Sequence, residues 1–416
     1  MAEEIITGVD IGSSKIRVVV GQVMPEERGK SSLHIIGAIE EVSQGVHKGS
    51  ISSMDDAVTS ISRALEKAER MTGLAINSAW VSIAGHHILV QESRGVVGVS
   101  KQDGEIREDD VDRAIEAART VATPSNYEIL HVIPKSFTID AQKGIKDPVG
   151  MTGIRLEVDA VIIQTLSSQI KNLTKSVYRT GLDIDDLVFS PLATAEAVLT
   201  SRQKDLGVVV VDIGATTTTM AVFEEGDILH VAVLPIGGDH ITNDVAIGLR
   251  TSLDVAEDVK VRIGHASPEA VHSKVEYKLS DFGSAEEDVI KKKFVAEIIK
   301  ARTEEIFEAV DDELRKIDRS GMLPVGAVLT GETVKLEGLT DVAKNVLRLP
   351  VSVGVPEAVS SVIDEVKDAG YATAVGLAIW GFSIRSNTSK GLFQLKFGGV
   401  DQVADQLRKW IKSLIP

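Results

Sequence analysis

The chain has 416 residues and contains no cysteine. Disulfide bonds and thiolate chemistry are therefore excluded, and a reducing compartment is allowed. Basic residues are fewer than acidic ones: the chain has 45 Lys and Arg and 61 Asp and Glu, which gives a formal net charge of −16. Neutralising the phosphates of a nucleic acid needs a basic face, so we expect no nucleic-acid partner.

Long apolar runs are missing as well. The longest strongly apolar stretch, residues 369–384, is shorter than the roughly 20 residues that a membrane-spanning helix needs, and it predicts a buried helix instead. The first residues, MAEEIITGVD, are acidic and lead directly into a strand pattern, so no secretory signal is expected. We therefore expect a cytoplasmic protein, in which a hydrophobic share of 43% is enough to fill two core-bearing lobes.

What the sequence does contain is the same short motif twice. Val-Asp-Ile-Gly occupies residues 9–12 and 211–214, each time before hydroxyl residues and an apolar run. A glycine at such a turn brings backbone N–H groups close to phosphate oxygens, and hydroxyls add further donors. The aspartate can hold Mg²⁺ through water, since Mg²⁺ keeps several waters and takes one or two carboxylates. One copy alone is explained by a tight turn, but two copies, each opening a three-strand meander, predict two hairpins that hold one polyphosphate from both sides.

Two further segments fit a nucleotide site. Residues 325–339 predict an apolar strand that ends at Thr330-Gly331-Glu332, where a glycine allows close approach of a flat adenine or ribose. Glu257 and Lys260 are three residues apart and share one helix face, although a surface salt bridge is the better explanation of that spacing alone. The P-loop and the dinucleotide fingerprint do not occur, so the commoner nucleotide folds are not supported.

Helix and strand signals alternate along the rest of the chain. Residues 79–100 predict a pair of strands, 107–122 one helix, and further strands follow up to residue 164, which together form a strand-helix-strand unit inside the first lobe. Residues 287–317 predict one long charged helix. After a stretch rich in Ser, Gly, Lys and Phe, residues 399–416 carry apolar side chains at helical spacing.

The order of these elements resembles that of the actin, sugar-kinase and DnaK-type chaperone superfamily: phosphate hairpin, connecting helix, phosphate hairpin, adenosine strand-turn, connecting helix. Within it, the chain is similar to the FtsA family of bacterial cell-division proteins, through the segments GVDIGSSKI, GVHKGSI, VSIAGHHI, LGVVVVDIGATTT, LPIGGDHITNDVA and AVLTGET. The inserted unit strengthens this resemblance, since actin and the chaperones lack it, whereas FtsA and its pilus-assembly relative PilM carry a subdomain there.

The resemblance implies an α/β fold of two actin-like lobes. The lobes would be duplicated and ribonuclease-H-like, with an inserted small α+β subdomain and a C-terminal amphipathic helix. The predicted segments are 1–83 and 162–201, completed by about 362–385, for the first lobe; 84–161 for the inserted subdomain; 202–239 and 324–361 for the core of the second lobe; 240–323 for its outer subdomain; 386–398 for a linker; and 399–416 for the helix.

Carried over residue by residue, the resemblance implies ATP and Mg²⁺ as cofactors. It gives Asp10 and Asp212 the role of holding Mg²⁺ through water. Ala215 departs from the commoner glycine of the superfamily, which slightly narrows the backbone angles allowed. The implied nucleotide-binding residues are Gly12, Ser13, Ser14, Lys15, Gly214, Ala215, Thr216, Thr217, Gly237, Gly238, Glu257, Lys260, Gly331 and Glu332.

A second departure concerns hydrolysis. In the chaperones and in MreB, a glutamate before the proline of the first connecting helix helps to position the attacking water, and here that residue is Ser190. Serine has no charge to orient or deprotonate water, and such general-base help is worth about 10²–10⁴-fold in rate. We therefore expect ATP binding with at most slow hydrolysis, and we assign no catalytic residue.

Two partner surfaces are expected. The resemblance places the binding surface for the C-terminal peptide of FtsZ in the outer subdomain of the second lobe, where Lys293 and Arg302 are the candidates for contacting an acidic peptide. The apolar stripe of 399–416, with its tryptophan and neighbouring basic residues, is typical of a helix that lies in a membrane interface, although such a helix more often docks on the protein's own core. The candidate membrane residues are Val403, Leu407, Arg408, Lys409, Trp410, Ile411, Lys412 and Leu414.

The family resemblance implies a protein that polymerises and tethers the FtsZ ring to the anionic inner face of the cytoplasmic membrane at the division site, with later division proteins as further partners. A PilM-like role in pilus assembly is the closest alternative, because PilM shares the insertion. A sugar or acetate kinase of this fold is less favoured, since we find no convincing carboxylate base for a substrate hydroxyl. A chaperone would need a long substrate-binding domain after the second lobe.

Overall fold

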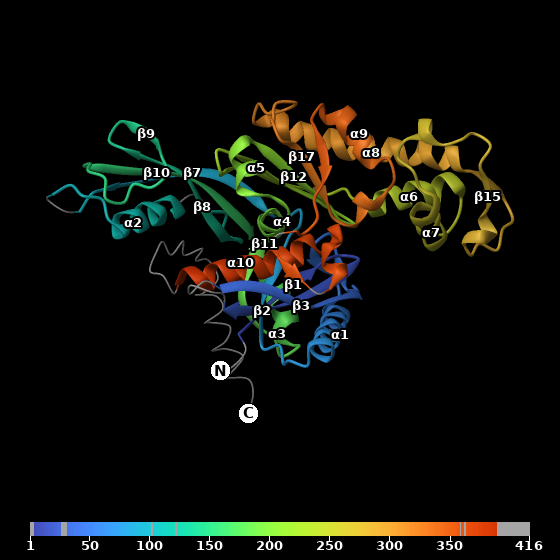
Figure 1. The fold of residues 1–416 in the computed structure, drawn as a ribbon, viewed down its shortest axis with the longest axis horizontal. Helices are drawn as coiled ribbons and strands as arrows, with labels where there is room; N and C mark the ends of the chain where they lie inside the picture. Colours follow the sequence, from blue (N-terminus) through green and yellow to red (C-terminus); the bar gives the residue numbers. More distant parts are fainter. Residues whose placement is uncertain are drawn as a thin grey trace.

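Two sheets that share the same order over five strands form the two lobes of the computed structural model (Figure 1). The structure describes residues 4–25, 31–100, 103–120, 123–357, 359–361 and 363–388. The first sheet contains β1 (Ile5–Ile11), β2 (Lys15–Pro25), β3 (Ser31–Val42), β6 (Ser78–Ile83), β11 (Asp183–Phe189) and β19 (Ser360–Ser361), and the second contains β12 (Val208–Ile213), β13 (Thr218–Glu224), β14 (Asp227–Leu234), β17 (Gly326–Thr330) and β18 (Val351–Val353). The first is ordered β11-β6-β1-β2-β3-β19 and the second β18-β17-β12-β13-β14. The repeated motif therefore belongs to a repeated lobe.

The central strand β12 is buried on both faces, which explains its run of valines. Val208 and Val210 contribute to the core that the second sheet shares with the first lobe. Val209 and Val211, which point the other way, contribute to the core beneath the helices of the second lobe. A strand that pairs on both sides and is covered on both faces carries a continuous apolar run rather than an alternating one.

Helices cover both faces of the first sheet. On one side lie α1 (Met54–Thr72) and α3 (Ser167–Tyr178). The buried face of α1 repeats at helical spacing, and Gly73 ends the helix in the left-handed conformation with φ of 71°. On the other side lies α10 (Ala372–Thr388), which crosses α4 (Ser190–Val198) so closely that a Cβ on Gly376 would lie 1.8 Å from the carbonyl oxygen of Ala193.

The inserted unit has a sheet and a core of its own (Figure 1). It comprises β7 (Leu89–Gly98), α2 (Glu108–Arg119), β8 (Tyr127–Ile139), β9 (Gln142–Ile145) and β10 (Arg155–Leu166), with the strand order β7-β10-β8-β9. The pairing predicted within residues 79–100 is wrong, because β6 is flanked by β1 and β11 in the first sheet and so has no free edge for β7.

The outer part of the second lobe lies at the opposite end of the molecule (Figure 1). It contains α6 (Gly238–Leu249), α7 (Leu253–Ile263), β15 (Glu276–Lys278), β16 (Val289–Lys291) and α8 (Lys292–Lys316). The helix predicted from residue 287 thus begins later, since Val289–Lys291 pairs with β15 as an extended strand. The remaining strands and α-helices are β4 (Val46–His47), β5 (Ser50–Ile51), α5 (Ser201–Leu206) and α9 (Leu339–Leu347).

Helix α10 continues to Thr388, so the first residues of the predicted linker 386–398 are helical. The rest of that linker and the predicted amphipathic helix 399–416 lie outside the described residues. Within the described ranges, no helix combines the length and the apolar character that crossing a membrane requires.

Candidate nucleotide-binding site

The turns of the two repeated hairpins meet at a cavity of about 160 Å³ between the lobes. Both turns are closed in the same way, because the Gly12 N–H donates to the Lys15 carbonyl at 3.0 Å and the Gly214 N–H donates to the Thr217 carbonyl at 3.0 Å. The Thr216 hydroxyl then donates across the cleft to Ser13 Oγ at 2.9 Å. The two turns therefore face each other and are in contact.

Each hairpin places an aspartate beside this cavity. Desolvation by the surrounding protein raises the pKa of Asp10, although the Ser82 hydroxyl, at 2.7 Å, and Arg17 oppose the shift. Desolvation, reinforced by the neighbouring Asp10 carboxylate, raises the pKa of Asp212 to about 6. The Asp10 carboxylate thus acts on Asp212 as a like charge, and such a pair favours a cation beside it.

Hydroxyls surround Asp212 on the side of the connecting helices. Thr373 of α10 donates to Asp212 Oδ2 at 3.1 Å, and Thr194 of α4 does so at 3.4 Å. The same two threonines also lie 2.8 Å apart, oxygen to oxygen. The two crossing helices are thus tied to the carboxylate of the second hairpin.

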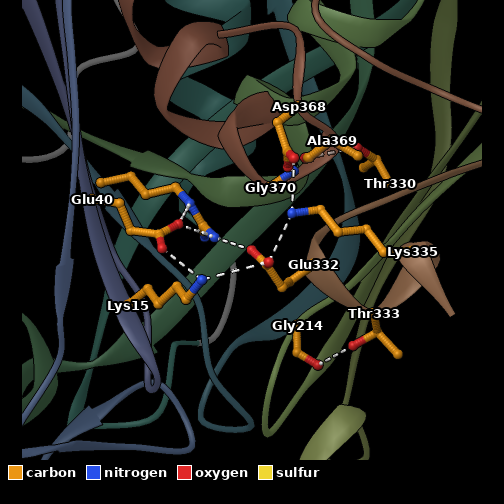
Figure 2. A network of polar contacts seen from close by, with 11 residues as sticks. Lys15, Glu40, Gly214, Thr330, Glu332, Thr333, Lys335, Asp368, Ala369 and Gly370 are labelled. Carbon is orange, nitrogen blue, oxygen red and sulfur yellow. Dashed lines mark hydrogen bonds and ion pairs between the residues drawn. The ribbon is translucent and has the colours of Figure 1, made fainter. Parts of the chain in front are cut away.

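A network of ion pairs joins the lobes at the edge of the cavity (Figure 2). Glu332 of the second lobe accepts from Arg17 and Lys335, and Lys335 also contacts Asp368 at 2.8 Å. Lys15 lies 2.6 Å from Glu40 and 3.5 Å from Glu332 (Figure 2). Burial alone would lower the pKa of Arg17, but Glu40 and Glu332 together raise it. The ammonium of Lys15, expected at the phosphates, is therefore held by two carboxylates.

Glycines allow the neighbouring segments to approach the second hairpin closely. Gly331 has a φ of 90°, and a Cβ there would lie 2.3 Å from Asp212 Oδ1. The Gly238 N–H donates to the Gly214 carbonyl at 2.9 Å. The preceding residue, Gly237, is packed as tightly, because a Cβ on it would lie 2.5 Å from the Gly214 carbonyl oxygen.

A second cavity, of about 270 Å³, continues from the first. Glu257, Lys260, Glu332 and Thr333 line both. The Lys260 ammonium lies 2.6 Å from Glu257 and 2.8 Å from the Thr242 hydroxyl, so the pair spaced three residues apart forms a real ion pair at the junction. Apolar walls come from Val261 and Leu336.

The structure brings all of the sequence-predicted nucleotide and metal residues except Gly237 to the lining of the first cavity. Ser190 joins them as the first residue of α4, whereas Glu196 contacts Lys204 at 2.7 Å instead. Sequence reasoning missed several lining residues, and strand register could have found some of them, because they lie opposite the aspartates on neighbouring strands. The missed residues are Ile11, Arg17, Gly49, Ser82, Ala84, Thr219, Asp239, Thr333, Gly370 and Thr373.

The two candidate peptide contacts, Lys293 and Arg302, lie on α8, and neither lines this cavity. Lys293 is exposed. Arg302 is engaged, since its guanidinium donates to Asp244 at 2.6 and 3.0 Å and to Glu305 at 2.6 Å. The structure therefore leaves Lys293 accessible and holds Arg302 in a local network.

The duplicated lobes and the cleft between them define an actin-like protein with an insertion. A solved PilM-PilN type IV pilus biogenesis complex contains a similar chain, with a TM-score of 0.65, 17% identity, and coverage of 90% of this chain and 98% of that one. MreB5 of Spiroplasma citri bound to ADP is similar with a TM-score of 0.56 and 13% identity, over 93% of this chain and 98% of that one. Identities this low show the fold alone.

Sequence comparisons are more specific. The family model for cell division protein FtsA matches residues 209–376, and the model for the SHS2 domain inserted in FtsA matches residues 85–164. The FtsA of Pseudomonas aeruginosa is 36% identical over 99% of this chain and 98% of its own length, and that of Bacillus subtilis is 39% identical over 90% and 82%. The chain belongs to the FtsA family of cell-division proteins.

Proposed function

We propose that the cleft binds ATP together with Mg²⁺. The observation that carries this proposal is the pair of facing turns with identical backbone closure, each following a strand whose next-to-last residue is an aspartate. The phosphates would lie between these turns, where backbone N–H groups and hydroxyls can donate to them. The nucleoside would occupy the second cavity, between the apolar walls of Val261 and Leu336.

The residues present fit a magnesium ion. Among the described residues there is no cluster of three or more His, Asp or Glu side chains that could hold a metal alone. Mg²⁺ does not need one, because it keeps several waters and is commonly bound by one or two carboxylates plus substrate phosphates. Asp10 and Asp212 would hold it through water. Desolvation raises the pKa of both carboxyls, and the Asp10 carboxylate raises that of Asp212 further, so a cation beside them would be favourable. The ion would neutralise phosphate charge.

Hydrolysis in this site would be slow. Ser190, at the start of α4, lines the cavity but offers only a hydroxyl, and the carboxylate of Glu196 is bound by Lys204. A site without a general base at the attacking water forgoes about 10²–10⁴-fold in rate. We expect phosphate release far below the roughly 10 s⁻¹ of a typical enzyme.

Calorimetry of the full-length protein with ATP, in magnesium and in EDTA, tests the binding proposal. We expect binding that is clearly tighter with magnesium. Heat that does not saturate under either condition would overturn the assignment of the cleft. Tight binding that magnesium leaves unchanged would overturn the role given to the two aspartates.

At the level of the cell, we propose a polymerising, peripheral membrane protein that tethers the FtsZ ring to the cytoplasmic membrane and meets later division proteins. Family membership supports the role in division. Lys293 can meet an acidic FtsZ peptide directly, whereas Arg302 would have to exchange Asp244 for a peptide carboxylate. The apolar stripe with Trp410 in the last residues supports contact with anionic lipid.

Vesicle flotation tests the membrane contact. The full chain should float with anionic vesicles, and the chain ending at residue 398 should not. Trp410→Glu should release the full chain from vesicles while its ATP affinity stays unchanged. Unfolding of the lobes by Trp410→Glu would instead identify 399–416 as a helix docked on the core.

A further inference from the structure

The carboxylate of Asp212 lies in a row of side chains that crosses the second sheet. Asp212 is opposite Thr219 in the antiparallel pair of β12 and β13, and next to Thr330 in the parallel pair of β12 and β17. Directly opposed residues of an antiparallel pair project from the same face, with Cβ atoms roughly 4.5–5.5 Å apart. A hydroxyl therefore flanks Asp212 on each side.

These two hydroxyls differ in one respect. Thr330 is fully buried and its hydroxyl donates to the Ala369 carbonyl at 3.1 Å. Thr219 is 5% exposed and lines the cavity, but its buried Oγ1 has no hydrogen-bond partner among the described residues. A buried hydroxyl without a partner destabilises a fold, and most such groups are paired once the ligand or water that belongs to them is present.

The neighbouring hydroxyls leave one oxygen of Asp212 available. Thr194 and Thr373 both donate to Oδ2, and no hydrogen bond within the described residues reaches Oδ1. Thr219 is thus an unused hydroxyl beside a carboxylate with an unused oxygen, both at the lining of one cavity. Two such groups can be satisfied together by one water or by one hydrated cation.

We propose that the Thr219 hydroxyl hydrogen-bonds a water in the hydration shell of the Mg²⁺ that Asp212 holds, and so positions the metal. The inference rests on the proposed binding of ATP with Mg²⁺. Water is favoured over phosphate as the direct contact because Thr219 lies on a strand beside a carboxylate, not at the turn, and a phosphate oxygen next to Asp212 would meet a like charge. Groups that hold a metal's outer shell in this way change metal affinity without touching the ion.

Three variants of the full-length protein test the proposal. Thr219→Val removes the hydroxyl at nearly constant shape, and Thr219→Ser keeps it. Thr330→Val is the matched control on the other side of Asp212, where the hydroxyl already has a protein partner. For each variant, ATP affinity is measured by calorimetry in magnesium and in EDTA, Mn²⁺ binding is measured by electron paramagnetic resonance, and the ligand-free protein is unfolded with urea.

Thr219→Val should lower the affinity for Mn²⁺ by about five- to tenfold, which is the usual net contribution of one hydrogen bond. It should reduce the increase in ATP affinity that magnesium causes by the same factor. Its ATP affinity in EDTA should not change, and its ligand-free stability should not fall, because no bond is lost. Thr219→Ser should bind the metal like the parent. Thr330→Val should have the opposite effects: the ligand-free protein should become less stable to urea, while the dependence of its ATP affinity on magnesium should stay as in the parent.

Other outcomes separate this inference from the function it rests on. If the parent protein binds no ATP, the proposed function fails and the inference fails with it. If the parent shows metal-dependent binding that Thr219→Val leaves intact, only the inference is wrong. An equal loss of ATP affinity with and without metal would place the hydroxyl on a phosphate, and a loss of ligand-free stability would make it a structural group; either result overturns the proposal.

Discussion

The two hairpins have the same topology and the same turn, yet they surround their aspartates differently. In the first lobe, the neighbour of the aspartate on the hairpin's second strand is a buried guanidinium. In the second lobe, the equivalent neighbour is a hydroxyl. The rows run Arg17, Asp10 and Ser82 in the first lobe, and Thr219, Asp212 and Thr330 in the second.

This difference assigns unequal parts to the two aspartates. The first lobe brings its own cation to Asp10, and Arg17 is in turn held by Glu40 and Glu332. The second lobe itself offers Asp212 only hydroxyls; Arg17 acts on Asp212 from the first lobe, yet desolvation and the Asp10 carboxylate raise the pKa of Asp212 to about 6. The two lobes thus share a backbone arrangement but differ at the residue opposite the aspartate, which is Arg17 in the first and Thr219 in the second. Asp212 therefore depends more than Asp10 on a cation that arrives with the ligand.

The largest expected effect comes from exchanging each carboxylate for an amide. Asp212→Asn should reduce the magnesium-dependent part of ATP affinity by about 10- to 100-fold, the range typical for groups that support a metal. Asp10→Asn should reduce it less, because the Arg17 guanidinium lies directly opposite Asp10 in the strand pair. Calorimetry in magnesium and in EDTA measures both losses. An equal or greater loss of magnesium-dependent ATP affinity in Asp10→Asn would show that the residues opposite the two aspartates do not decide which aspartate the metal needs more.

A pH profile of the ligand-free protein should report the titration of Asp212. The folded pKa of Asp212, about 6, lies above its ordinary value of 3.8, so the folded state binds this proton more tightly than the unfolded state does. The resulting stability is fully present below about pH 4 and is lost as pH rises through about 6. The two-unit difference corresponds to on the order of 3 kcal/mol. Urea unfolding between pH 3.5 and 7.5 measures it, and Asp212→Asn should flatten the decline; an unchanged slope would locate the titration elsewhere.

Much of this arrangement follows from the sequence, because a repeated Val-Asp-Ile-Gly carries its own turn and strand pattern. The lobes and the glycine positions could be expected on that basis. Arg17 and Thr219 could also be expected, from the register of each hairpin. Ser82 and Thr373 could not, since they reach the cavity through strand and helix packing rather than through any local motif. The same limit explains the wrong pairing within residues 79–100, where two strands adjacent in the chain join different sheets. Local pattern predicts a strand, but register and partner depend on the whole fold.

The ion pairs around Arg17 offer a smaller test. Glu40 pairs with Arg17 within the first lobe, whereas Glu332 reaches it from the second. Both glutamates are partly exposed, so Glu40→Gln and Glu332→Gln should each lower the free energy of unfolding by about 1 kcal/mol or less. Only Glu332→Gln should also loosen the contact between the lobes. Small-angle scattering should therefore show a larger radius of gyration for ligand-free Glu332→Gln alone; the same increase in Glu40→Gln would mean that the network acts within the first lobe.

The smallest expected effect is that of Ala215→Gly, at the residue after the glycine of the second motif; Ser13 is its counterpart in the first turn. Neither Ser13 nor Ala215 has a positive φ, so neither turn needs a glycine there. Ala215→Gly should therefore cost only the added freedom of the unfolded chain, about 0.4–1 kcal/mol, and should leave ATP affinity unchanged. Ser13→Gly should cost about 1 kcal/mol more, because the Ser13 hydroxyl also accepts from the Gly49 N–H at 3.3 Å and from Thr216 at 2.9 Å. Urea unfolding of the two variants measures the difference. A gain in stability from Ala215→Gly would mean that alanine strains the second turn, and the two turns would then differ in backbone as well as in their neighbours.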